Sequence, residues 1–230
     1  MSRRARVLAD ALAGLARGLA RDLARSEPRR GALDPVRVID VGAGDGDVGR
    51  RIARALGADL VAFDVSPVPT RPRRPAEPGL QVCAPRRPGA LGTAGSLVPT
   101  RAFVFDGRAL PAADRSFDLA LLSDVLHHAE APELLLRECL RVADAVLVKD
   151  HFSEGLLDDA LLTAMDLWGN AARGVASPGR YLSPLGWRAL FERVGAEPVA
   201  WVWPLDVHPA PIRLFTRSER QFAVRLERAS

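Results

Sequence analysis

Lysines, cysteines and long apolar runs are all scarce in this chain of 230 residues. Lysine occurs once, as Lys149, among 32 basic residues, so the other basic residues are arginines. The two cysteines, Cys83 and Cys139, lie far apart and lack the spacing of metal ligands. Two cysteines so placed cannot form a disulfide framework, and they favour a reduced, cytoplasmic protein. No apolar run approaches the ~20 residues of a membrane-spanning helix, so we expect no transmembrane segment.

Positive charge is concentrated in two segments of the chain. A pI of about 9.9 by itself would suit a nucleic-acid-binding protein. Residues 1–30 and residues 66–101 each carry a net charge of +5, whereas the whole chain carries +4, so the remaining residues sum to −6. Basic charge confined to one predicted helix and one predicted loop does not line a groove. A nucleic-acid partner is therefore disfavoured.

Residues 36–49, VRVIDVGAGDGDVG, have the pattern of a strand, a glycine turn and a helix. The apolar run ends at Val41, and Gly42, Gly44 and Gly46 follow on alternate positions. Such glycines adopt positive φ and let a ligand approach the backbone without hindrance from Cβ atoms. In an open α/β sheet a ligand binds beyond the carboxyl end of a strand. This segment is thus a candidate nucleotide-binding corner.

The rest of the chain alternates between strand-like and helix-like patterns. Apolar runs predict strands at 59–65, 102–105, 117–122 and 145–149, and a closing hairpin of 198–205 and 212–216. Helical periodicity predicts helices at 3–25, 132–142, 154–168 and 184–194. Residues 1–30 are expected to pack on the domain as an N-terminal helix, and eight prolines predict a long Pro/Arg-rich loop over 66–100. This order indicates an α/β fold with a Rossmann-like open sheet.

A second stretch, residues 105–142, predicts a turn, a strand and a helix in fixed succession: FDGRALPAADRSFDLALLSDVLHHAEAPELLLRECLRV. Together with DVGAGDG at 40–46 and Asp64 at a strand end, it resembles the class I S-adenosylmethionine-dependent methyltransferases. The resemblance covers about residues 36–217. It implies a single methyltransferase domain over 1–230, with about seven strands, mostly parallel with an antiparallel last strand, and helices on both faces. Residues 150–182 would form a cap on the acceptor side.

The resemblance implies S-adenosyl-L-methionine as the cofactor and gives roles to the glycine turn. Gly42, Gly44 and Gly46 would make room for the methionine and ribose parts of the cofactor. Asp40 would position its ammonium group. Asp64 would accept hydrogen bonds from both ribose hydroxyls, which the two oxygens of a carboxylate can do.

Four further residues acquire cofactor-side roles from the resemblance. Asp106 with Gly107 matches the position that meets the amino group of the adenine. Ser123 and Asp124 follow the strand 117–122, and such residues face the cofactor in folds of this family. Asp124 alternatively caps the short turn that follows it.

Three histidines lie beyond strand ends and are candidates for a catalytic base: His127, His128 and His151. Methyl transfer needs a base only where the acceptor keeps its proton until the transfer. His151 is the favoured candidate because it ends a compact polar cluster, Lys149-Asp150-His151, that contains the single lysine. No metal is predicted, since the nearby acids match no specific ligand spacing: Asp158, Asp159 and Asp166.

A nicotinamide-dependent dehydrogenase is the competing interpretation of the glycine turn, because residues 44–49 spell G-x-G-x-x-G. Counted from the strand end at Gly42, however, the third glycine position holds Asp47. An aspartate there would repel a pyrophosphate at the helix N-terminus. A sulfonium cofactor carries no phosphate, so the methyltransferase interpretation is favoured.

The sequence therefore predicts an S-adenosylmethionine-dependent methyltransferase acting on a small-molecule acceptor, such as a secondary metabolite, a quinone or a lipid-like compound. The alternatives are a non-catalytic cofactor-binding scaffold of the same fold and an RNA or protein methyltransferase. O-, N- and C-methylation all stay open. A homodimer is a further expectation that the sequence leaves open.

Overall fold

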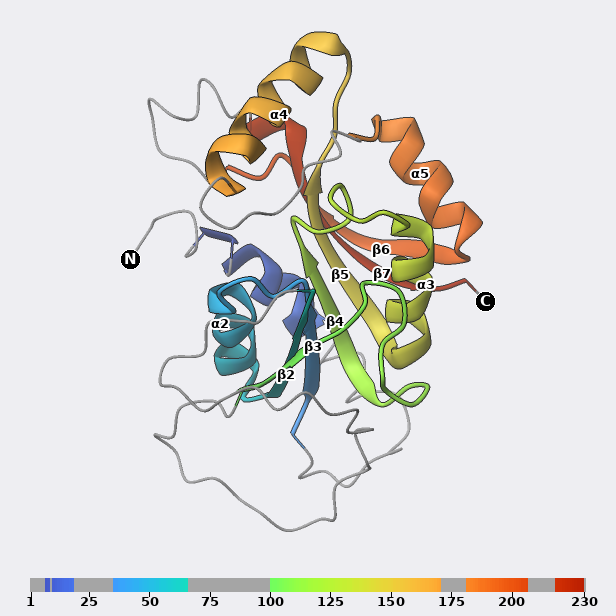
Figure 1. Cartoon of the computed structure of the whole chain (residues 1–230). Helices are drawn as coiled ribbons and strands as arrows, with labels where there is room; N and C mark the ends of the chain where they lie inside the picture. Colours follow the sequence, from blue (N-terminus) through green and yellow to red (C-terminus); the bar gives the residue numbers. More distant parts are fainter. Residues whose placement is uncertain are drawn as a thin grey trace.

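The computed structural model describes residues 7–8, 10–18, 35–65, 100–170, 181–206 and 218–229. Nearly all of the predicted loop 66–100, and residues 171–180 of the predicted cap, lie outside these ranges. In the described ranges seven strands form one sheet, with helices packed around it (Figure 1). Among the helices in those ranges, none combines the length and apolarity needed to cross a membrane.

The sheet has the strand order β3-β2-β1-β4-β5-β7-β6. Its strands are β1 Arg37–Val41, β2 Asp59–Asp64, β3 Thr100–Val104, β4 Phe117–Ser123, β5 Ala143–His151, β6 Ala196–Val202 and β7 Gln221–Arg228. Strands β1 to β5 pair in parallel, and β7 is antiparallel to both of its neighbours, β5 and β6. The predicted fold class is confirmed: a mostly parallel, Rossmann-like sheet in which the last strand is antiparallel.

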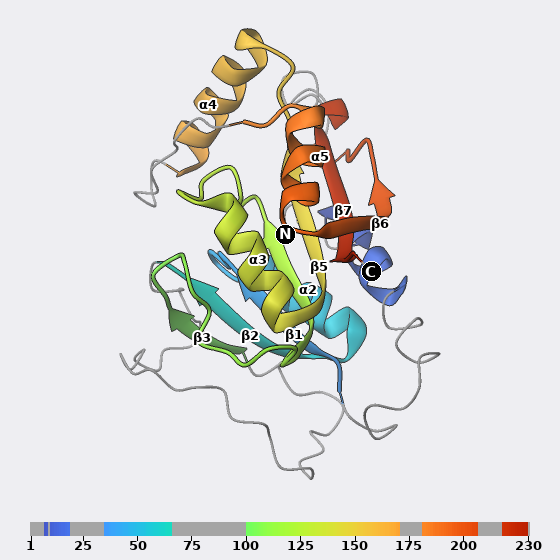
Figure 2. The ribbon, with the colours of Figure 1, turned by 90° about the vertical axis from the view of Figure 1, so that its right-hand side faces the viewer.

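Helices cover both faces of this sheet, as the side view in Figure 2 shows. They are α2 Asp47–Leu56, α3 Pro132–Val142, α4 Leu156–Asn170 and α5 Pro184–Arg193, with a short 3-10 turn at Ser218–Arg220. Helices α3 and α5 lie on one face, and α2 lies on the other together with the helical residues 7–8 and 10–18. Helix α4 stands apart, beyond the end of β5 (Figure 1).

Alternating side chains of the central strands fill two separate cores. In β4, Ala120 and Leu122 join Leu136 of α3 on one face, whereas Leu119 and Leu121 join Ile52 of α2 on the other. Successive side chains of a strand point to opposite faces, so a strand buried on both faces must be apolar throughout. The continuous apolar run that predicted this strand is a direct result of its central position.

The N-terminal helix packs on the α2 face of the sheet. Leu8, Leu12 and Leu15 are buried in the same core as Val38 of β1. These leucines belong to the apolar stripe seen in the sequence, and burial of each such side chain contributes roughly 1.5–3 kcal/mol. Leu19 and Leu23, which continue the stripe, lie outside the described residues.

The position of the last strand corrects the sequence prediction. Strand β7 is formed by 221–228, a tail that the family resemblance leaves out, and the predicted strand 212–216 lies outside the described residues. Phe222, Val224 and Leu226 face the α3 side, but buried Arg225 interrupts the apolar pattern. Because a charged residue interrupts its apolar run, the sequence pattern alone does not identify 221–228 as a buried strand.

Candidate active site

The glycine turn follows directly from β1 and holds three residues in the left-handed region. Gly42, Gly44 and Gly46 have φ values of 71°, 56° and 69°. A Cβ placed on Gly42 would lie 2.6 Å from Cγ2 of Val125, which is far inside van der Waals contact. Backbone conformation and lack of space therefore both demand glycine at position 42. Val125 is a neighbour of the turn that sequence reasoning missed.

Asp64 connects the end of β2 to this turn. Its Oδ2 accepts a hydrogen bond from the backbone N–H of Gly44 at 2.7 Å. One strand residue earlier, the carbonyl oxygen of Phe63 accepts from the N–H of Gly42 at 2.7 Å. The carboxylate of Asp64 is thereby fixed against the glycine turn, at the carboxyl edge of the sheet.

Asp40 lies beneath the turn and is almost completely buried. Burial raises the pKa of this carboxyl to about 7, and the negative charge of Asp64 contributes to the same rise. A Cβ on Gly49 of α2 would lie 2.2 Å from Oδ2 of Asp40, so only glycine leaves room for the acid. The third glycine of the G-x-G-x-x-G pattern thus accommodates a carboxyl group at the contact between helix and strand.

Asp106 and Gly107 lie in the loop after β3. Oδ1 of Asp106 accepts hydrogen bonds from the backbone N–H groups of Arg108 at 2.8 Å and Ala109 at 3.0 Å. These bonds hold the pKa of Asp106 below its usual range. Gly107 takes a φ of 76°. The carboxylate of Asp106 therefore stabilises its own turn. This turn lies next to the end of β2, because the N–H of Phe105 donates a hydrogen bond to the carbonyl oxygen of Asp64.

Ser123 and Asp124 stand at the end of β4, where the single lysine of the chain is also found. Asp124 has a φ of 57°, rare for a residue other than glycine, and Oδ1 of Asp124 accepts a hydrogen bond from Nζ of Lys149. Lys149 itself is 1% exposed. A buried ammonium needs a partner of opposite charge, and Asp124 provides it. The lone lysine is thus part of a buried charge pair rather than a solvated strand end.

All three candidate histidines gather beside this pair. The ring centroid of His127 lies 3.9 Å from that of His128 and 4.4 Å from that of His151. Nδ1 of His127 lies 2.7 Å from Oδ1 of Asp150, and both side chains are almost inaccessible to solvent. Burial lowers the pKa of His127, but the Asp150 carboxylate outweighs it and raises that pKa to about 10. The sequence places each of these histidines beyond a strand end, and the structure brings the three rings together.

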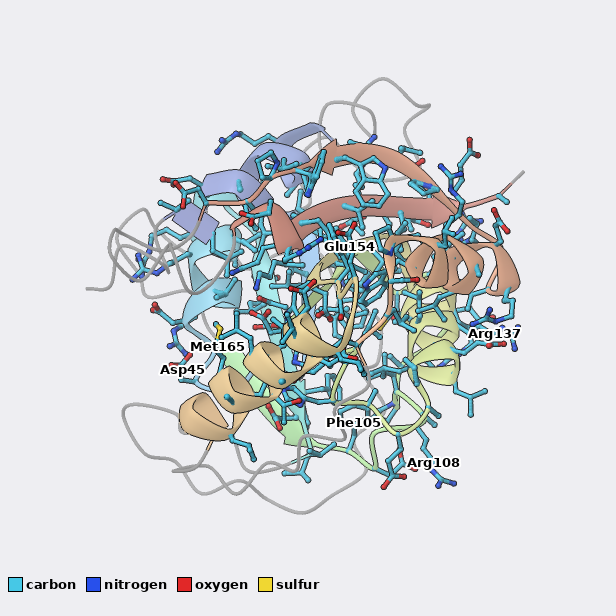
Figure 3. All side chains as sticks on the ribbon, turned by 90° about the horizontal axis from the view of Figure 1, so that it is seen from above. Asp45, Phe105, Arg108, Arg137, Glu154 and Met165 are labelled. Carbon is cyan, nitrogen blue, oxygen red and sulfur yellow. The ribbon has the colours of Figure 1, made fainter. Side chains whose placement is uncertain are left out.

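Two side chains from the predicted cap close over the histidines. Asp166 of α4 places Oδ2 3.4 Å from Nε2 of His127 and accepts a hydrogen bond from the hydroxyl of Tyr181 at 2.5 Å. The ring of Tyr181 lies 5.2 Å from that of His151. Figure 3 looks down onto this edge, with α4 running across it from the side of Glu154 toward the side of Asp45 in the glycine turn.

Sequence reasoning named Asp166 only among the acids of the helix 154–168 that could aid a cationic acceptor or a metal, and it gave Tyr181 no role, because no spacing links either residue to 127–151. The one available signal was that Tyr181 is the single tyrosine of the chain.

The residues around the glycine turn fit a cationic, phosphate-free cofactor. Three glycines leave the backbone uncovered by Cβ atoms, and Asp40 and Asp64 put two carboxyl groups next to it. Asp47 is the first residue of α2, where a dinucleotide's pyrophosphate would otherwise bind. Acids at these positions repel phosphate and suit the ammonium and sulfonium groups of S-adenosylmethionine.

Comparison with known proteins agrees with this geometry. Residues 39–145 match the family model described as a methyltransferase domain. A SAM-dependent methyltransferase from Aquifex aeolicus has 15% identity and a TM-score of 0.50, over 85% of this chain and 84% of that one. Mitomycin 7-O-methyltransferase MmcR also has 15% identity and a TM-score of 0.50, over 85% of this chain and 49% of that one.

The [4+2]-cyclase SpnF shares the fold as well, with 16% identity and a TM-score of 0.52, over 96% of this chain and 82% of that one. No curated protein matches the chain in sequence. At these identities a structural likeness shows the fold alone, and the methyltransferase assignment rests on the domain match over residues 39–145.

The domain match and the fold support a class I S-adenosylmethionine-dependent methyltransferase. Its cofactor is S-adenosylmethionine.

Proposed function

We propose that this enzyme transfers a methyl group from S-adenosylmethionine to a small-molecule acceptor bound beneath α4. The observation that carries the proposal is the polar cluster between the ends of β4 and β5 and the cap, where three histidines meet Asp166 and Tyr181. Secondary metabolites, quinones and lipid-like compounds are the acceptor classes that we expect. The mitomycin 7-O-methyltransferase with the same fold supports a small-molecule acceptor by analogy.

The cofactor would be held at the edge formed by the ends of β3, β2, β1 and β4, which are neighbours in the sheet. In this proposal Gly42, Gly44 and Gly46 admit its methionine and ribose parts, and Asp40 positions its ammonium group. Asp64 would bind the ribose hydroxyls, and Asp106 with Gly107 would meet the adenine amino group. Ser123 and Asp124 would face the cofactor on the side of the acceptor. When bound, the cofactor supplies an electrophilic methyl group on a sulfonium centre.

His151 is the histidine that we assign as the general base. Its Nε2 is buried and makes no hydrogen bond to any of the described residues, whereas Nε2 of His127 faces the carboxylate of Asp166 at 3.4 Å. The backbone of His151 is also fixed, because its carbonyl oxygen accepts a hydrogen bond from Nε1 of Trp187 at 3.1 Å. A rigid imidazole with an unused nitrogen is suited to receiving the proton of an acceptor hydroxyl or amine.

The cap over 150–182 would exclude water from the reacting atoms, which strengthens electrostatic interactions within the site. Arg220 fixes the start of α4, since its Nη2 lies 3.1 Å from Oδ2 of buried Asp158. In this proposal the chain works as one domain, 1–230. The homodimer stays a prediction, which sedimentation equilibrium of the purified chain would test.

Two other functions are set against this one. SpnF shares this fold and is a cyclase, so a protein of this architecture need not act as a methyltransferase; this keeps the non-catalytic, cofactor-binding scaffold as an alternative. An RNA or protein methyltransferase is the second alternative, and the net charge of −6 outside the two basic segments counts against the RNA form.

The proposal is tested with S-adenosylmethionine labelled in its methyl group, incubated with the enzyme and a broad pool of metabolites, RNA and proteins. We expect label in one or a few small molecules, and a much slower transfer to the same molecules when His151→Gln replaces the wild type. Label in RNA or protein would favour the second alternative. Cofactor binding without transfer to any pool would favour the scaffold.

A further inference from the structure

The histidines and Asp166 form a group whose ligand atoms converge, although their positions in the sequence show no such pattern. One ring nitrogen each of His127 and His128, and one carboxylate oxygen of Asp166, lie within 4.8 Å of one another. We propose that this group is a site for a divalent transition-metal ion of the zinc class, with three protein ligands and one open position.

The orientation of His127 is the first support for this proposal. Its Nδ1 is bonded to Oδ1 of Asp150 at 2.7 Å, which leaves Nε2 directed at the carboxylate of Asp166. Histidines that bind metals usually donate their other ring N–H to a carboxylate or carbonyl, which fixes the tautomer and the ring. Asp150 therefore occupies the place of the outer partner of a metal-binding histidine.

A buried nitrogen with no hydrogen bond is the second support. His127 is 3% exposed, and its Nε2 makes no hydrogen bond to any described residue, although it lies 3.4 Å from Oδ2 of Asp166. Two ligands held at about 2.0–2.1 Å from a tetrahedral zinc ion are about 3.4 Å apart. Without metal this contact is an ion pair, and its separation suits two ligands of one ion. An ion bound here would take the place of the Nε2 proton, which would be released to solvent.

The composition of the group selects the kind of metal. Imidazole nitrogens suit zinc, iron, nickel and copper, whereas magnesium and calcium prefer oxygen ligands alone. Two histidines and one carboxylate are a common set in sites that keep one position for water or substrate. Because His127 and His128 follow β4 and Asp166 lies on α4, the ion would also fasten the cap to the sheet edge.

A second group, His127, Asp150 and His151, meets the same distance limit but is less suitable. There the Nδ1 of His127 and the carboxylate of Asp150 already bind each other. A metal would have to break that bond, whereas the group with His128 and Asp166 keeps it.

Metal binding is measured on the full chain, without reference to methyl transfer, so that this proposal and the proposed function fail separately. The purified chain is dialysed against Zn²⁺ without chelator, and bound zinc is counted by mass spectrometry. We expect about one zinc ion per chain, with Mg²⁺ failing to compete. Co²⁺ in its place should give visible absorption bands typical of four-coordinate cobalt.

His128→Asn and Asp166→Asn remove one ligand each and should abolish stoichiometric binding. Asp150→Asn should weaken binding roughly 10–100-fold, as loss of an outer partner does. Asp159→Asn, which changes an acid of α4 outside the group, is the matched control and should bind as the wild type does. Circular dichroism verifies that each variant is folded. No bound zinc in the wild type, or binding in His128→Asn and Asp166→Asn equal to that of the wild type, would overturn the proposal.

Discussion

His127 and Asp150 form a pair at 2.7 Å whose side chains are 1% and 0% exposed. Asp150 is the penultimate residue of β5, and His127 follows β4 by four residues, so the pair joins the two central strands at their carboxyl ends. The positive charge of His127 holds the pKa of Asp150 below its usual range, although burial opposes this. The site is therefore organised around a buried ion pair.

Breaking this pair should destabilise the fold. Asp150→Asn keeps the shape of the side chain and removes its charge, and we expect a loss of about 3–5 kcal/mol, as found when one member of a buried pair is removed. His127→Gln should cost a similar amount. In urea unfolding, the double variant should cost clearly less than the sum of the two single variants. Additive losses would mean that the two side chains do not interact.

The glycine turn makes a prediction about packing. Gly42→Ala adds a Cβ at 2.6 Å from Val125 and places a side chain in the left-handed region, so we expect a loss of about 1–3 kcal/mol. Val125→Ala removes the atoms that clash. The combination of both changes should therefore recover part of the stability lost in Gly42→Ala, measured by urea unfolding. Equal stability of Gly42→Ala and the wild type would contradict the close approach of these two residues.

The raised pKa of Asp40 predicts that the stability of the fold depends on pH. Because its folded pKa is raised to about 7 from an ordinary value of 3.8, the folded state holds a proton that the unfolded chain has released. The contribution of the protonated carboxyl to stability is thus full below about pH 4 and is lost as pH rises through about 7.

Asp40→Asn mimics the protonated acid at every pH and provides the control. Its stability relative to the wild type should increase between pH 4 and pH 7, by up to about 1.4 kcal/mol per pH unit. Denaturant unfolding of the cofactor-free proteins at several pH values measures this difference. A difference that stays constant over that range would show that Asp40 titrates normally.

His151 makes a prediction about catalysis. With an acceptor identified by the labelling experiment, His151→Gln should lower kcat by about 10²–10⁴ if the imidazole removes a proton. The affinity for S-adenosylmethionine should not change, because the proposed cofactor residues lie at the ends of β1, β2, β3 and β4, whereas His151 ends β5. Asp159→Asn serves as the control with normal kcat. Full turnover by His151→Gln would remove this residue as the base.

The sequence is most informative where function and fold depend on consecutive residues. It predicts the turn 42–46 because the backbone conformation there requires glycine, and it predicts β4 because a central parallel strand is apolar on both faces. The edge on which His127, His128 and His151 lie also follows, since parallel strands end on the same side.

The features that could not be predicted from the sequence depend mainly on contacts between distant segments. Asp166 and Tyr181 reach the histidines only because α4 crosses the sheet edge, and no periodicity reports such a contact. Gly49 belongs to a dinucleotide-like pattern in the sequence, but its space is filled by Asp40 in the fold. Strand β7 escapes prediction because Arg225 is buried in a strand that is otherwise apolar at its centre.

The central claim is that S-adenosylmethionine binds at the glycine turn, and calorimetric titration of the cofactor into wild type and Asp64→Ala tests it most directly. Loss of the carboxylate should strand the ribose hydroxyls and weaken binding by about 1–3 kcal/mol, or roughly 5–150-fold in Kd. Asp59→Asn, at the opposite end of β2, should bind like the wild type. Tight binding by the wild type with a large loss in Asp64→Ala alone is the predicted result, and equal affinity in all three proteins would contradict the account.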